Sequence, residues 1–209
     1  MSFREQIETQ YQVVAIGRQL VIVDVQKQFA DSKKLLKPIL DYVKGFDEII
    51  FIWDTLYQLE QDKEGESHLM QMLREMKDSG IHVRMEEIGK KYGFLRGAMD
   101  TNESEQDIVN VLRFMLKHSL GDSRDIQNDH KAEWENYAKK FNIQYVPEGF
   151  AGDESESMAL PDDVVDVLKG KIKQRPILIG GARDACLQEI FLVLKAMGLQ
   201  PEINEKYTY

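Results

Sequence analysis

The segment from Ile177 to Glu189 carries the strongest chemical signal in the sequence. An apolar run there ends at paired glycines, and an amphipathic helix beginning around Asp184 follows. Cys186 would lie in the first turn of that helix, where backbone amides and the positive end of the helix dipole stabilise a thiolate. The same amides can hold an oxyanion. A lone cysteine also packs well as a small apolar residue, so two hypotheses stand for Cys186: a nucleophile and a core residue.

A cysteine nucleophile needs a base and gains from a nearby cation. Asp24 follows the apolar run from Leu20 to Val23, and Lys90 and Lys91 follow a run at about residues 81–88. The structural alternatives are a helix cap for the aspartate and ordinary exposed positions for the lysines. An acid, a lysine and a cysteine that each follow an apolar run nevertheless indicate a shared site.

The apolar runs predict the elements that must position these residues. Residues 20–23, 49–53 and 177–179 are continuously apolar, which is typical of parallel strands buried on both faces. Helical spacing between the first two runs, from Lys33 to Val43, completes a β-α-β unit. The sequence therefore predicts an α/β fold with right-handed crossovers, whose ligands bind at the carboxyl ends of the strands. Asp24, Asp54 and Gly180-Gly181 would then share one edge of the sheet.

The middle of the chain has a different pattern. Apolar spacing predicts helices over residues 105–118, 131–141 and 162–168, whereas residues 119–130 and 147–160 have the Gly, Asp, Ser and Asn content of loops. We therefore expect a helical segment at about residues 100–142 within a single domain that spans residues 1–209.

Composition excludes several classes of function. The chain has 209 residues and a formal net charge of −9, which disfavours binding to nucleic acids and to anionic membranes. No apolar run approaches the roughly 18 residues of a membrane-spanning helix. A single cysteine cannot form an internal disulfide, and the first residues do not resemble a signal peptide. We expect a soluble cytoplasmic protein.

Taken together, these motifs resemble those of the isochorismatase-like cysteine hydrolases, which include the nicotinamidases. The similarity rests on Asp24 in Asp-Val-Gln, on a lysine after a middle strand, and on Gly-Gly-Ala-Arg-Asp-Ala-Cys-Leu before a late helix. It covers about residues 19–54 and 175–202. The segments at residues 49–54, 90–93 and 204–209 also resemble a divergent branch of this superfamily that is associated with large phage and viral genomes. The resemblance implies a three-layer α-β-α fold with a mainly parallel central sheet, frequent oligomers, and a cofactor-free Asp-Lys-Cys triad acting on amides and related acyl substrates.

The resemblance also implies a role for each residue. Cys186 would attack the carbonyl, Asp24 would move the proton, and Lys90 or its neighbour Lys91 would stabilise the thiolate. Amides near Ala182 and Cys186 would bind the oxyanion. The candidate substrate-binding residues are Phe29, Trp53, Asp54, Tyr92, Gly181 and Ala182.

The sequence departs from the family pattern at two places, and both affect the roles that the resemblance implies. Related enzymes have a metal-binding Asp and His after the second strand, two residues apart, but Leu56 stands at the histidine position here. We therefore expect no metal, and we expect all four histidines to be structural or superficial. If the lysine-bearing strand were instead residues 143–146, Glu148 would take the place of the cation and the triad would be broken.

A second function class remains open. A catalytically silent relative would bind a metabolite or a protein partner, and it could bury Cys186. A nucleotide-phosphate site at Gly180-Gly181 is weaker, because no Gly-x-Gly-x-x-Gly spacing is present. The helix after Cys186 is apolar over most of its circumference, so more than one of its sides must pack against other parts of the protein. We therefore predict a homo-oligomer in which a second copy covers one of these sides.

Overall fold

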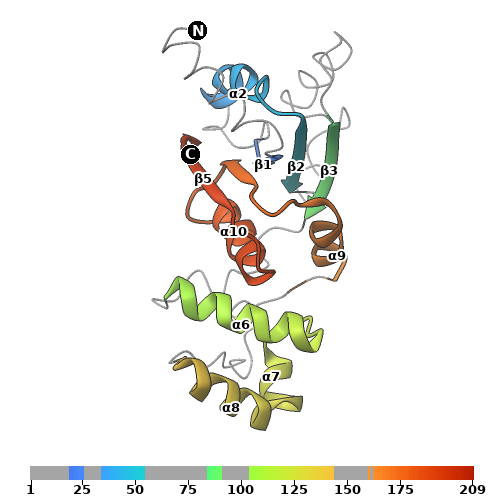
Figure 1. Cartoon of the computed structure of the whole chain (residues 1–209), viewed down its shortest axis with the longest axis vertical. Helices are drawn as coiled ribbons and strands as arrows, with labels where there is room; N and C mark the ends of the chain where they lie inside the picture. Colours follow the sequence, from blue (N-terminus) through green and yellow to red (C-terminus); the bar gives the residue numbers. More distant parts are fainter. Residues whose placement is uncertain (1–18, 26–33, 55–83, 91–103, 144–159, 161) are drawn as a thin grey trace, which may run out of the picture.

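The computed structural model describes residues 19–25, 34–54, 84–90, 104–143, 160 and 162–209, with strand β3 and the end of β2 described through their backbone (Figure 1). These residues form an α/β structure, as the sequence predicts. Among the described helices, none is long and apolar enough to cross a membrane.

Five strands form one sheet in the order β3-β2-β1-β4-β5, and every neighbouring pair is parallel. The strands are β1 (Gln19–Val23), β2 (Glu48–Asp54), β3 (Arg84–Lys90), β4 (Ile177–Gly180) and β5 (Glu202–Thr208). Strand β3 begins and ends later than the expected residues 81–88. Since β1 lies between β2 and β4, the chain changes direction across the sheet at β1, which is where parallel α/β sheets bind ligands.

Side chains of β1 alternate between two hydrophobic clusters. Leu20 and Ile22 pack with Ile39 and other residues of helix α2 (Leu36–Val43). Val21 and Val23 pack on the other face, against helices α9 (Asp162–Lys171) and α10 (Cys186–Ala196). Figure 1 shows α2 on one side of the sheet and α10 with α9 on the other. All five residues of β1 are therefore buried, which explains why the four residues 20–23 are apolar without alternation.

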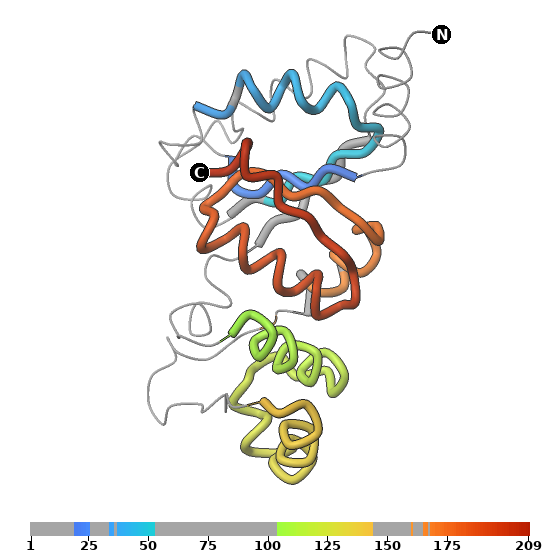
Figure 2. Tube along the Cα trace, turned by 60° about the vertical axis from the view of Figure 1, so that its left-hand side comes forward, coloured from blue at the N-terminus to red at the C-terminus, as the bar shows by residue number. Residues whose placement is uncertain are grey.

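A further helical layer lies beyond α10 (Figure 2). It consists of α6 (Glu105–His118), α7 (Arg124–Asp129) and α8 (Lys131–Phe141). The predicted bounds of α6 and α8 are confirmed. The expectation of a loop throughout residues 119–130 is wrong, because α7 forms there around the buried Ile126. Helix α9 ends at Lys171, three residues beyond the predicted Leu168.

Contacts inside the chain join the helical layer to the sheet. Apolar side chains of α6 and α10 belong to the same cluster, and Lys195 of α10 pairs with Glu105 of α6. The side chain of Arg113 also donates to the carbonyl oxygen of Lys195, at 3.4 Å. The apolar circumference of α10 is thus covered by the sheet on one side and by α6 on the other. The apolar surface of α10 therefore does not need a second copy of the chain to cover it. The homo-oligomer remains a prediction.

Candidate functional site

The ends of β1 and β4 meet at a point where only glycine fits. Val23 pairs with Gly180, which has a φ of +105°. A Cβ at Gly180 would lie 2.0 Å from the carbonyl oxygen of Val23. The amide of the next residue, Gly181, donates to that same oxygen at 3.0 Å. The two strands therefore leave the sheet in direct backbone contact, which explains the first glycine of the pair.

Asp24 is fully buried at this edge and has a φ of +50°. Its amide donates to the carbonyl oxygen of Ile52 at 2.8 Å, which connects it to β2. Its own carbonyl oxygen accepts the hydroxyl of Tyr209, also at 2.8 Å. The backbone around Asp24 is consequently held by three segments, and a left-handed conformation at a non-glycine residue is typical of functional sites.

Cys186 is the first residue of α10, two residues after the expected helix start. Its side chain is 3 % exposed and belongs to the apolar cluster below the sheet. The amide of Leu187 donates to the carbonyl oxygen of Ala182 at 3.1 Å. The Gly181–Ala182 peptide bond is cis. Cys186 therefore begins a helix that starts near the carboxyl edge of the sheet, but its side chain is enclosed rather than open to solvent.

Strand register brings three other predicted residues to this edge. Lys90 is paired with Asp54 at the last position of the β2–β3 ladder, and Trp53 is paired with Gly89. Backbone register thus gathers Asp24, Asp54, Lys90 and Gly181 at the carboxyl ends of neighbouring strands. Four other residues weighed from the sequence lie outside the described residues: Phe29, Lys91, Tyr92 and Glu148.

Tyr209 is a residue of this edge that sequence reasoning missed. A Cβ on Gly181 would lie 2.6 Å from two carbons of the Tyr209 ring, so that ring packs directly on the glycine. The Tyr209 amide donates to Gly180 at 3.1 Å, and its carbonyl oxygen accepts the amide of Arg183 at 2.7 Å. The sequence shows only that an aromatic residue follows the last strand. Tyr209 reaches this edge because β5 lies beside β4, and the sequence pattern does not predict that strand order.

Arg183 fixes the turn between β4 and α10. Its Nε donates to the Glu205 carboxylate at 2.9 and 3.1 Å, and its Nη1 donates to Gln188 at 2.7 Å. The turn that precedes Cys186 is therefore tied both to β5 and to its own helix. Such fixed backbone is what a site needs if it is to orient a small substrate.

A second group of ionisable side chains lies in the helical layer. His118 ends α6, His130 lies between α7 and α8, and Glu133 is in the first turn of α8; one ligand-type atom from each lies within 4.8 Å of the others. The hydrogen bond from the His130 imidazole, with 2.8 Å between Nδ1 and Oε2, lowers the pKa of Glu133 from its ordinary value. The sequence did not predict this cluster, because the two histidines are twelve positions apart in the chain.

Comparisons with known proteins give no match: no family model, no curated protein and no solved structure is similar to the chain at a significant level.

Proposed function

We propose that the protein is a cysteine hydrolase of the isochorismatase-like kind that acts on a small amide or a related acyl compound. Cys186 is the nucleophile, Asp24 the general base and acid, and Lys90 the cation that stabilises the thiolate. The three-layer α-β-α architecture of that family and a reducing, cytoplasmic setting, in which the thiol stays reduced, are parts of the same proposal.

One observation carries this proposal, namely the strand register at the carboxyl edge. Asp24 directly follows β1, which lies between β2 and β4. Lys90 is the last residue of β3, and α10 begins with Cys186 soon after β4 ends. Neighbouring strands are about 4.8 Å apart, so the backbones of Asp24 and Lys90 are separated by roughly 10 Å. The flexible four-carbon stem of lysine bridges much of such a gap.

The chemistry follows from the residue types. Asp24 takes the thiol proton, and the Cys186 sulfur attacks the carbonyl carbon to form a tetrahedral intermediate whose oxyanion is held by backbone amides. The C–N bond then breaks, the nitrogen leaves with the proton from Asp24, and a thioester remains. A water deprotonated by Asp24 hydrolyses the thioester and restores the thiol. Burial of both residues keeps bulk water away and favours a small substrate.

The test is release of ammonia from nicotinamide and a panel of small primary amides. Cys186→Ala should abolish hydrolysis, and Asp24→Asn and Lys90→Ala should each lower kcat by at least about 100-fold. The matched controls are Asp166→Asn, at an exposed position of α9, and Lys139→Ala, at an exposed position of α8, which should keep full activity. Hydrolysis that persists in Cys186→Ala would reject the mechanism.

The burial of Cys186 favours a second candidate, a catalytically silent protein that binds a metabolite or a protein partner. At 3 % exposure, the thiol belongs to an apolar cluster with residues of β1 and α6. Alkylation by iodoacetamide separates the two functions. A hydrolase should lose activity as Cys186 reacts at neutral pH in the folded protein, whereas a structural thiol should react only after unfolding.

A further inference from the structure

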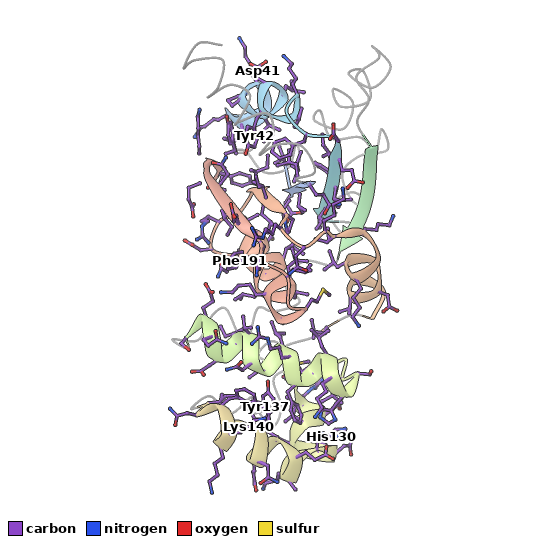
Figure 3. The ribbon with its side chains drawn as sticks, viewed as in Figure 1. Asp41, Tyr42, His130, Tyr137, Lys140 and Phe191 are labelled. Atoms are coloured by element: carbon purple, nitrogen blue, oxygen red, sulfur yellow. The ribbon has the colours of Figure 1, made fainter. Side chains whose placement is uncertain are left out.

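We propose that His118, His130 and Glu133 form a binding site for a divalent transition-metal ion, with Zn²⁺ as the preferred ion, which joins the end of α6 to the start of α8. The site is separate from the proposed hydrolase and does not depend on it. His130 lies in the region of α7 and α8, on the far side of α6 from α10 (Figures 1 and 3).

The distances already approach those of a metal site. Nδ1 of His130 lies 2.8 Å from Oε2 of Glu133, and Nδ1 of His118 lies 3.7 Å from the same oxygen. Ligand atoms about 2.0–2.1 Å from a tetrahedral zinc ion are roughly 3.4 Å apart. All three ligand atoms lie within 4.8 Å of one another, so the separations are close to those that a single ion requires.

Aromatic packing holds both imidazoles in place. The Phe114 ring lies 4.4 Å from that of His118, centroid to centroid, and 6.4 Å from that of His130, with an edge-on angle of 80°. The two histidine rings are 4.8 Å apart. The Trp134 ring also packs edge-on against Phe114, with 5.1 Å between the ring centroids. Rings that are oriented before an ion arrives lower the entropy cost of binding it.

The position of the His118 ring favours a bound metal ion over a direct contact with Glu133. Its Nε2 is buried and has no hydrogen-bond partner in the described part of the chain. At 3.7 Å its Nδ1 is too far from Glu133 for a hydrogen bond. The Nδ1 nitrogen of His118 and the Glu133 carboxylate are both metal-ligand types, and a cation between them would be stabilised by both. The negative end of the α6 dipole, at His118, adds to that attraction.

The donor set selects the class of metal. Two imidazole nitrogens and one carboxylate oxygen suit zinc and other late first-row ions, and they suit Mg²⁺ and Ca²⁺ poorly because those ions prefer oxygen ligands. The Glu133 side chain is 62 % exposed, so water can fill the fourth position. His118 lacks an acceptor for its second ring nitrogen, which typically costs about 10–100-fold in affinity. We therefore expect binding in the micromolar range.

The experiment titrates Zn²⁺ and Co²⁺ into the full chain after treatment with a chelator. We expect one ion per chain, a cobalt absorption spectrum typical of four-coordination without a thiolate charge-transfer band, and a higher Tm in zinc. Glu133→Gln keeps an acceptor for His130 but removes the anionic ligand, and it should weaken zinc binding at least about 10-fold. His118→Gln and His130→Asn should weaken it at least about 100-fold.

Two controls guard against other zinc sites. Glu135→Gln makes the same chemical change at an exposed position of the same helix and should leave the affinity within about twofold of the original. Cys186→Ser removes the only thiol and should also leave it unchanged. Because Glu133 is exposed, Glu133→Gln should fold even if a histidine variant does not. The proposal would be overturned if no zinc bound at a concentration 100-fold above the expected micromolar dissociation constant. Equal zinc affinities of Glu133→Gln and Glu135→Gln would also overturn it.

Discussion

The carboxyl edge of the sheet and the histidine cluster of the helical layer bring functional side chains together in opposite ways. At the edge, the backbone decides the arrangement: Val23, Asp24, Gly180 and Gly181 are joined by strand register, by close contact and by amide hydrogen bonds. Buried Asp24 and Cys186 have little freedom there. We therefore expect the edge not to tolerate a substitution that adds a side-chain atom at Gly180 or Gly181.

In the histidine cluster, side-chain packing decides the arrangement. Three helix ends supply His118, His130 and Glu133, and the side chains are 17 %, 27 % and 62 % exposed. The two imidazoles pack against the Phe114 ring, and no shared backbone ladder joins the three residues. The cluster can therefore adjust by rotamer changes. Because of this difference, we expect a small substitution to cause a large loss of stability at the edge. In the cluster, the loss should increase gradually with the size of the change.

The largest effect is expected for Gly180→Ala. The new Cβ would lie 2.0 Å from the Val23 carbonyl oxygen, and the residue would keep a φ of +105°. Since backbone atoms of both strands would have to move, the free energy of unfolding should fall by about 4 kcal/mol or more. Urea unfolding followed by circular dichroism measures this loss.

The matched control for that substitution is Gly170→Ala in α9, where an added Cβ would meet no atom within 4 Å. Alanine has the better helix propensity, so this variant should be unchanged or more stable by up to about 1 kcal/mol. Similar stabilities for the two variants would show that the edge is not fixed by its backbone.

Sequence patterns predicted the edge better than the cluster, for a physical reason. Continuous apolar runs that end in Asp24 and Gly180 are local signals, and parallel strands necessarily bring their carboxyl ends together. The bounds of α6 and α8 were also predicted from local apolar spacing, and they are confirmed. In contrast, the meeting of His118 with His130 depends on α7, which lies within residues expected to be a loop, and Tyr209 depends on strand order. Such contacts are set by tertiary packing, which apolar spacing does not encode.

The next effect concerns Phe114, whose ring contacts both histidines of the cluster. Phe114→Leu keeps an apolar side chain of similar size but loses the ring contacts with His118, Trp134 and Tyr137. The free energy of unfolding should fall by about 1–2 kcal/mol. If the rings orient the ligands, zinc affinity should fall as well, even though no ligand is changed. A calorimetric titration that shows full affinity would mean that the histidines are oriented by their helices alone.

A smaller effect is expected for Tyr209→Phe at the edge. The variant keeps the ring on Gly181 but removes the hydroxyl that donates to the Asp24 carbonyl oxygen at 2.8 Å. One lost hydrogen bond should cost about 1 kcal/mol. Because Asp24 would be held less firmly, iodoacetamide should reach Cys186 faster in the folded protein. Mass spectrometry of the alkylated chain measures that rate.

Tyr207→Phe is the control for the Tyr209 variant. The Tyr207 ring stacks on Tyr42 at 4.3 Å, and its hydroxyl forms no hydrogen bond with the described residues. This variant should therefore keep both the stability and the alkylation rate of the original chain. Equal alkylation rates for the two variants would show that the Tyr209 hydroxyl does not hold the edge closed.

The smallest effect is a loss of stability at high pH caused by Tyr137, which lies in the helical layer. Burial raises the pKa of Tyr137 above its ordinary value of 10.0, and its hydroxyl donates to the carbonyl oxygen of Asn110 at 3.3 Å. The folded protein therefore retains this proton when the unfolded chain has begun to lose it. The contribution to stability is complete below the unfolded pKa and is lost as pH rises from about 10 through the folded pKa. A difference titration of the tyrosinate absorbance, the original chain minus Tyr137→Phe, should place this group above pH 10. Titration at or below pH 10 would mean that the hydroxyl is solvated, and that the packing around Phe114 is looser than the structure indicates.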